Sequence, residues 1–209
     1  MGSMRSAGGG KADLPLRRAT PPEWAELVLR EPLALLNDHA YLEKKAALNV
    51  LDLLNRWPDG ADAPEWIATL AGIARDEATH LTAVAGLLRR RGGALDRTHK
   101  NPYASDLHKL VRTGRGHEEL ADRLLISALI EARSCERFGV LARRGGDDDL
   151  AGLYRSLWAS EFGHYKVFLR MALDVPKAGN VSERWDWMLN REAEIIARQA
   201  PGPRIHSGI

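Results

Sequence analysis

The chain has 209 residues, of which 44% are hydrophobic and 28% are charged, and its formal net charge is +2. These values fit one globular domain with a sizeable helical core, and they exclude binding to a polyanion through net charge alone. The single cysteine, Cys135, excludes an internal disulfide and is typical of a reducing compartment. No apolar run approaches the roughly eighteen residues of a membrane span, and no secretory leader is recognisable. We therefore expect a soluble, cytoplasmic protein.

The two ends of the chain are expected to lie outside the folded domain. Residues 1–20 are predicted to be a disordered leader, because residues 1–4 resemble an expression remnant and the glycine-rich stretch that follows has little to bury. Pro21 and Pro22 then open a short amphipathic segment at residues 23–30. We expect the helical domain to span residues 21–199 and residues 200–209 to be a flexible tail.

Long stretches of helical periodicity predict four core helices. The first begins at Pro32 and continues to about residue 57, and the second runs from Pro64 to the arginines before Gly92, a residue suited to a left-handed helix cap. The third spans about residues 118–144, and the fourth begins at three aspartates, residues 147–149, which favour the helix dipole. Shorter helices are predicted at residues 105–111 and 182–199. The long connection between the second and third core helices can cross the bundle.

Each core helix has an apolar seam at steps of three and four residues, and each seam contains one glutamate. In the second and fourth helices a histidine follows that glutamate three residues later. A carboxylate and an imidazole at this spacing lie about one turn apart on one helix face, so both can reach the same metal ion. The inward polar residues are Glu43, Glu77, His80, Glu131, Glu161 and His164.

This set matches the ligands with which four-helix bundles hold two metal ions, one Glu from each of two helices and Glu-x-x-His from each of the others. Four buried carboxylates without partners would cost several kcal/mol each, and two divalent ions would neutralise them. Carboxylates and imidazoles without thiolates suit iron or manganese better than structural zinc, and we expect iron. We predict all six residues to be catalytic metal ligands.

Two neighbouring residues are candidates for supporting roles. Asp76 lies four residues before His80, where it could accept the second ring proton of that histidine and fix its tautomer. A position facing solvent is the alternative. His39 lies four residues before Glu43 and could line the site, or it could be a satisfied core histidine.

The connection between the second and third core helices is strongly basic. Residues 89–115 carry a local charge of +6, so the rest of the chain sums to −4. Such asymmetry favours contact with nucleic acid, with Tyr103 as a possible stacking surface. A merely solvated crossover is the alternative. The predicted phosphate contacts are Arg97, Lys100, Lys109, Arg112 and Arg115.

Three segments within these helices resemble signature segments of the tRNA 2-methylthio-N6-isopentenyladenosine hydroxylases. They are residues 38–47 (DHAYLEKKAA), residues 130–138 (IEARSCERF) and residues 160–165 (SEFGHY). The resemblance covers about residues 33–173, and the string EARSCERF discriminates far better than the metal pattern does.

The resemblance implies an all-α, ferritin-like four-helix bundle with one long crossover and extra terminal helices, holding a non-haem di-iron centre on the six predicted ligands. It further implies a monooxygenase that hydroxylates the isopentenyl group of the modified adenosine beside a tRNA anticodon. Such a reaction uses O2 and two electrons from an external reductase or electron-transfer protein. The implied partner is the tRNA anticodon loop, with neither DNA nor a membrane involved.

Two other classes of function remain open from the residues alone. The same six ligands would serve another ferritin-like di-iron oxidase or oxygenase that acts on a small molecule. A helical binding module without enzymatic activity is the second alternative, and the presence of bound iron would exclude it.

Overall fold

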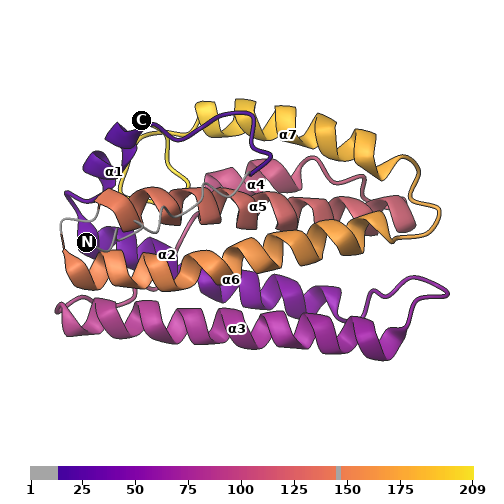
Figure 1. Cartoon of the computed structure of the whole chain (residues 1–209), viewed down its shortest axis with the longest axis horizontal. Helices are drawn as coiled ribbons and strands as arrows, with labels where there is room; N and C mark the ends of the chain where they lie inside the picture. The colour runs from indigo at the N-terminus through magenta and orange to yellow at the C-terminus, as the bar shows by residue number, and fades with distance from the viewer. Residues whose placement is uncertain (1–13, 145–146) are drawn as a thin grey trace, which may run out of the picture.

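The computed structural model describes residues 14–144 and 147–209, which form seven helices (Figure 1). Residues 1–13 of the predicted leader and the glycines at 145 and 146 lie outside the described residues. The helices are α1 (Pro22–Val28), α2 (Pro32–Leu53), α3 (Ala63–Arg90), α4 (Pro102–His108), α5 (His117–Arg144), α6 (Asp148–Leu173) and α7 (Val181–Ala197). None of the helices in the described part of the chain is both long and apolar enough to cross a membrane.

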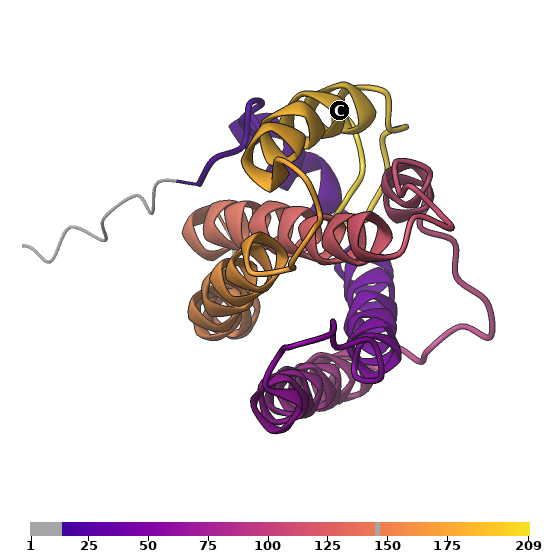
Figure 2. The same cartoon turned by 90° about the vertical axis from the view of Figure 1, so that its right-hand side faces the viewer.

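The four long helices form two hairpins, α2 with α3 and α5 with α6, that pack into one bundle (Figure 1). The connection from α3 to α5 contains α4 and crosses between the hairpins. In the end-on view, α7 covers the opposite side of α5 from α3 (Figure 2). The predicted four-helix bundle with a long crossover and extra terminal helices is therefore confirmed.

Local signals explain where the core helices begin and end. The side chains of Asp62 and Asp147 accept hydrogen bonds from the first-turn amides of α3 and α6, which satisfies free N–H groups at both helix starts. Gly92 ends α3 with a φ of 80°, the left-handed conformation that the sequence predicts. Helix α4 begins earlier than predicted, because Asn101 caps it and Pro102 occupies its first turn.

The hydrophobic core consists of two clusters, one toward each end of the bundle. One cluster includes Val50, Ile73, Leu124 and Phe168. The other includes Leu36, Val84, Phe138 and Leu157. On every core helix the predicted metal ligands lie between residues of the two clusters. The ligands therefore form a polar layer that apolar side chains seal on both sides.

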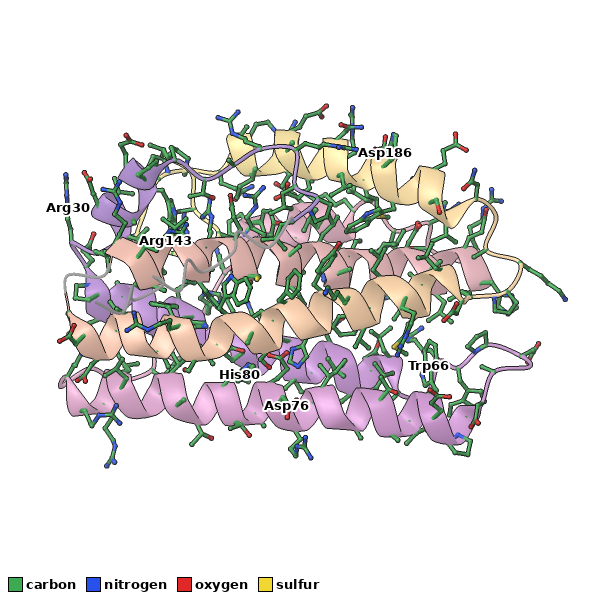
Figure 3. All side chains as sticks on the ribbon, viewed as in Figure 1. Arg30, Trp66, Asp76, His80, Arg143 and Asp186 are labelled. Atoms are coloured by element: carbon green, nitrogen blue, oxygen red, sulfur yellow. The ribbon has the colours of Figure 1, made fainter. Side chains whose placement is uncertain are left out.

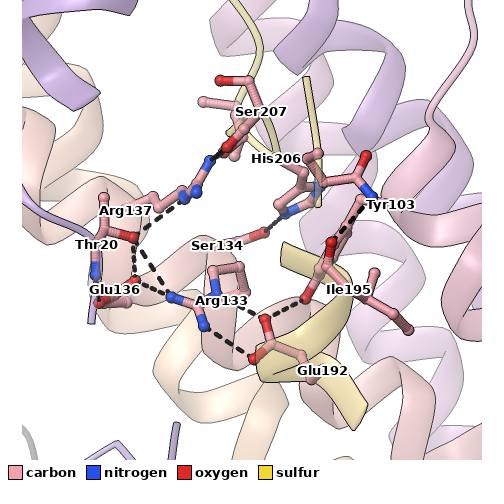
Figure 4. Close-up of polar contacts among 12 residues, drawn as sticks. Thr20, Tyr103, Arg133, Ser134, Glu136, Arg137, Glu192, Ile195, His206 and Ser207 are labelled. Atoms are coloured by element: carbon pink, nitrogen blue, oxygen red, sulfur yellow. Dashed lines mark hydrogen bonds and ion pairs between the residues drawn. The ribbon is translucent and has the colours of Figure 1, made fainter. Parts of the chain in front are cut away.

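The C-terminal residues contradict the prediction of a flexible tail. Ile205 and Ser207 are fully buried, and Arg137 of α5 donates hydrogen bonds to both of their carbonyl oxygens (Figure 4). The amide of Ile205 donates to Asp38 Oδ2 at 2.8 Å, and Trp24 Nε1 donates to Ser207 Oγ at 3.0 Å. Hydrogen bonds to buried polar groups of α1, α2 and α5 therefore hold the tail in place.

Residues 14–20 also depart from the predicted disordered leader. Leu14 and Leu16 pack against the core, and both the amide and the hydroxyl of Thr20 donate to the carboxylate of Glu136 at 2.7 Å (Figure 4). This pairing joins residues 116 positions apart, so local composition carries no signal for it.

Candidate metal centre

All six predicted ligands meet at the centre of the bundle, and each is at most 8% exposed. Helix α2 contributes Glu43, α3 contributes Glu77 and His80, α5 contributes Glu131, and α6 contributes Glu161 and His164. Figure 3 shows His80 between α3 and α6. Their inward orientation follows from the apolar seams, which must face the core.

The ligand atoms form two overlapping groups, and within each group they lie no more than 4.8 Å apart. Glu77 and Glu161 belong to both groups. The first group is completed by Glu43 and His80, and the second is completed by Glu131 and His164. This arrangement suits two neighbouring ions that share two carboxylates, with one further carboxylate and one imidazole for each ion.

Both histidines present Nδ1 to the carboxylates. His80 Nδ1 lies 3.1 Å from Glu161 and 3.6 Å from Glu43, and His164 Nδ1 lies 2.7 Å from Glu77 Oε1. Each imidazole therefore approaches a carboxylate from a different helix, which ties the two hairpins together at this layer.

Several buried polar atoms of the cluster lack hydrogen-bond partners, namely both oxygens of Glu77, Oε1 of Glu161 and Nδ1 of His80 and His164. Although His164 Nδ1 and Glu77 Oε1 are close, they are not aligned for a hydrogen bond, and the same is true of His80 Nδ1 and Glu161 Oε1. Buried polar atoms in proteins nearly always have partners. Inward-facing donor atoms with no partner are what metal binding requires, so these residues fit a pair of ions.

Without metal, protons must compensate the crowded carboxylates. Burial and then the neighbouring Glu161 and Glu77 raise the pKa of Glu43 well above its usual value, and Glu131 is affected in the same way. Although burial opposes it, contact with Glu161 raises the pKa of His80 to about 12. Burial alone would raise the pKa of Glu77, but its contacts with His164 and His80 outweigh burial and lower that pKa to about 2. Metal binding must therefore displace protons from these groups.

Of the two candidate supporting residues, Asp76 has a different neighbour from the one that the sequence suggested, whereas His39 lies beside Glu43 as expected. Asp76 Oδ2 lies 3.7 Å from Nε2 of His164, so its nearest imidazole belongs to α6 and not to His80 of its own helix. This distance exceeds that of a hydrogen bond. His39 is fully buried, and its Nε2 lies 2.5 Å from Glu43 Oε1. Burial lowers the pKa of His39 to about 4, so the neutral ring can donate to Glu43 and orient it.

A cavity of about 590 Å³ adjoins the cluster between α2, α4 and α5. It reaches Glu131, and its apolar wall includes Leu42, Ala46 and Ile130. Its polar lining includes Lys45, Asn49, His99, Lys100, His108 and Ser127. Sequence analysis missed this cavity. Leu42, Ala46 and Asn49 recur at helical spacing, but nothing distinguishes that pattern from ordinary core packing.

The residues of the basic connection have separate environments. Lys100 lines the cavity, and Arg97 is exposed. Lys109 is 2.6 Å from Asp106, and Arg115 is 3.4 Å from Glu118. The predicted stacking role of Tyr103 is wrong, because the ring is fully buried and its hydroxyl donates to Glu192 (Figure 4).

Arg112 does not fit the predicted role in phosphate binding. Its guanidinium donates to both oxygens of Asp122, at 2.8 and 2.9 Å, and to Glu118 at 3.0 Å. Asp122 is fully buried and needs this charge. The sequence places a basic residue in a basic stretch, but only the fold shows the acid that it compensates.

We expect Arg112→Ala to lower the free energy of unfolding by about 1–3 kcal/mol, because it removes the bidentate partner of a buried carboxylate and leaves Asp122 with Arg184 and the backbone amide of residue 112. Affinity for tRNA should stay unchanged. Chemical denaturation and a filter-binding assay measure the two quantities. Weaker tRNA binding without loss of stability would instead show that Arg112 contacts the nucleic acid.

Comparison with known proteins identifies relatives over nearly the whole chain. A relative from Pseudomonas putida, a tRNA 2-(methylsulfanyl)-N(6)-isopentenyladenosine(37) hydroxylase, is 35% identical over 192 residues, covering 91% of this chain and 90% of that protein. The protein of the same name from Salmonella typhimurium is 30% identical over 239 residues, covering 91% and 86% respectively.

A solved structure has the same fold. It is described as protein 43 with aldehyde deformylating oxygenase activity from Synechococcus, and it superimposes with a TM-score of 0.82 at 30% identity. The match covers 92% of this chain and 96% of that one, which confirms the predicted ferritin-like fold. The family model of tRNA-(MS2IO6A)-hydroxylase (MiaE) matches residues 11–207. With this match and the two relatives, the chain belongs to the tRNA-(MS2IO6A)-hydroxylase family of ferritin-like oxygenases.

Proposed function

We propose that this protein is a di-iron monooxygenase that hydroxylates the isopentenyl group of 2-methylthio-N6-isopentenyladenosine next to the tRNA anticodon. The observation that carries the proposal is a six-ligand cluster with a substrate-sized cavity at Glu131, in a chain that belongs to this family. Both relatives are named as hydroxylases of that nucleoside in tRNA.

The ligand groups suggest how two ions are held. Glu43 and His80 would serve one ion, Glu131 and His164 would serve the other, and Glu77 with Glu161 would serve both. Carboxylate and imidazole ligands suit iron, which we propose as the metal. When bound, a di-iron centre supplies the reductive activation of O2 that oxidation of a C–H bond needs, with both electrons coming from an external donor protein or reductase.

The chain's own side chains position the substrate and exclude water. The apolar wall of Leu42, Ala46 and Ile130 is suited to a prenyl chain, and its contact with Glu131 brings that chain to the cluster. A cavity of about 590 Å³ lies within the range of small-molecule sites. A nucleotide in an anticodon loop is already unpaired, so turning it into the cavity costs little.

A small-molecule oxygenase is the second candidate, and one observation favours it. The Synechococcus structure carries aldehyde deformylating oxygenase activity in its description and is as similar in sequence as the Salmonella relative. The cations around the cavity, Lys45 and Lys100, favour the tRNA substrate, because an aldehyde offers no phosphate for them to bind.

The deciding experiment supplies the iron-loaded protein with O2, a chemical or protein reductant and tRNA that carries the methylthio-isopentenyl nucleoside. We expect nucleoside mass spectrometry to show a gain of one oxygen atom on the isopentenyl group. Consumption of a fatty aldehyde by the same preparation, with no change in the tRNA, would establish the second candidate instead.

A bulky side chain in the apolar wall should block the reaction without disturbing the metal. We expect Ala46→Phe to lower kcat/KM on tRNA by about tenfold or more, because the phenyl ring takes up cavity space that the isopentenyl group needs, and a pocket misfit of even one methylene changes kcat/KM by about 10–200-fold. Iron content and melting temperature should stay close to those of the wild type. Leu48→Phe, on the same helix but 56% exposed, is the matched control and should retain full activity. Wild-type kinetics for Ala46→Phe would mean that the substrate enters elsewhere.

A further inference from the structure

The ammonium group of Lys45 is exposed at the cavity but makes two hydrogen bonds to His99. Its Nζ lies 2.9 Å from His99 Nδ1 and 3.4 Å from the His99 carbonyl oxygen, and both residues line the cavity. An ammonium group can only donate hydrogen bonds, so Nδ1 of His99 must accept. The ring proton of His99 is then on Nε2.

His99 is fixed in turn by Asp38. His99 Nε2 lies 2.7 Å from Asp38 Oδ1 and donates to it, while the ring stacks on Tyr41 with centroids 4.9 Å apart. The other oxygen of Asp38 accepts from the amide of Ile205 at 2.8 Å. A chain of hydrogen bonds therefore runs from the buried C-terminal tail through Asp38 and His99 to the ammonium of Lys45.

The tail end of this chain is firmly anchored. Arg137 donates to the carbonyl oxygens of Ile205 and Ser207, and His206 between them lies 3.2 Å from the hydroxyl of Ser134 (Figure 4). These contacts keep the amide of Ile205 in place. Asp38 therefore has both oxygens occupied, one by the anchored tail and the other by His99.

Lys45 differs from Lys109 and Arg115 of the basic connection in what it contacts. Lys109 and Arg115 each lie against a carboxylate, whereas no carboxylate of the described residues is within ion-pair distance of Lys45. Its hydrogen bonds go to a ring nitrogen and a carbonyl oxygen, and both are uncharged. A fixed cation whose charge no adjacent acid cancels is suited to an anionic oxygen of a ligand.

We propose that Lys45 is a substrate-positioning residue that binds a phosphate oxygen of the modified nucleotide, and that Asp38 and His99 hold it in place for this role. The inference rests on the proposed function and deepens it. Lys45 and Glu131 line the same cavity, so a phosphate held by Lys45 fixes how far the base and its isopentenyl group enter toward the metal ligands.

The test compares Lys45→Met with Lys44→Met on iron-loaded protein. Lys44 is the adjacent residue, carries the same charge, lies over the ring of Tyr41 and does not line the cavity. We expect Lys45→Met to raise KM for tRNA about tenfold to a hundredfold, as expected for loss of a charged hydrogen bond. We also expect little change in kcat, and a salt dependence of tRNA binding that is shallower by about one unit. Lys44→Met should match the wild type in all three quantities.

Two further measurements separate phosphate binding from a structural role. The free modified nucleoside has no phosphate, so Lys45→Met should oxidise it as the wild type does, and Lys45→Arg should restore part of the tRNA affinity. Asp38→Asn should raise KM for tRNA less than Lys45→Met does. In the double variant it should raise KM little further, because both changes remove the same phosphate contact.

Each failure has a separate meaning. If the wild type hydroxylates no tRNA, the proposed function and this inference fall together. If the wild type is active and Lys45→Met behaves as Lys44→Met does, only the inference falls. Lys45→Met could lower activity equally on the nucleoside and on tRNA, or both Lys45 variants could have less iron and a lower melting temperature. Either result would show that Lys45 shapes the cavity and binds no phosphate.

Discussion

Replacing Glu77 or Glu161 with alanine should remove both irons, whereas replacing Glu43 or Glu131 should remove about one. The two ligand groups share Glu77 and Glu161, so either loss affects both ions, while Glu43 and Glu131 each belong to one group. Hydroxylation should fall by more than about 100-fold in all four variants, since changes even at residues that only hydrogen-bond to metal ligands cost about 10–100-fold.

Iron and protein assays on proteins loaded under identical conditions measure this difference. Glu136→Ala is a useful control, because Glu136 also lies on α5 but contacts Thr20 and Arg133 away from the cluster. It should keep both ions. Equal iron content in Glu77→Ala and Glu43→Ala would contradict the sharing of carboxylates, and full loading in every variant would exclude these residues as ligands.

Removing the metal should make the stability of the protein depend strongly on pH. In the folded, metal-free protein Glu43, Glu131 and His80 all have raised pKa values, so they hold protons that the unfolded chain releases. The unfolded state then binds fewer protons, and the free energy of unfolding must fall as pH rises. Glu77, with a pKa of about 2, stays charged throughout and adds nothing in this window.

The expected size follows from the number of protons. One net proton corresponds to about 1.4 kcal/mol for each pH unit, so the melting temperature should fall by about 5–10 °C between roughly pH 6.5 and 8.5. Thermal unfolding in the presence of a chelator measures it, with the iron-loaded protein as control. That control should be more stable at every pH in this range, because bound metal stabilises the folded state. A metal-free protein whose stability rises over this pH interval would show that the carboxylates are not buried together.

The six candidate ligands could be predicted from the sequence because the signals for them are local. Helical periodicity fixes which face of each helix is apolar, and a glutamate within that face must point inward with it. The Glu-x-x-His spacing then brings His80 and His164 beside Glu77 and Glu161 on their own helices. Start and stop signals such as Pro32 and Gly92 likewise act within one or two turns.

The features that sequence reasoning missed depend on contacts between different elements of the fold. Arg112 was predicted to bind phosphate, but the bundle places it against Asp122. Asp76 was paired with His80 of its own helix, but the packing of α3 on α6 brings it to His164. Helical spacing specifies the neighbours of a residue on its own helix and carries no information about the facing one.

The sequence by itself determined the four core helices, their inward ligands and, through its resemblance to known hydroxylases, the family. Only the tertiary structure decided which carboxylates the two ligand groups share, where the cavity lies, and that the C-terminal tail is buried. The ordered position of Lys45 shows the physical reason. It depends on His99, 54 residues away, and on Asp38, whose other partner Ile205 is 167 residues away, and contacts at such separations exist only after the helices have packed.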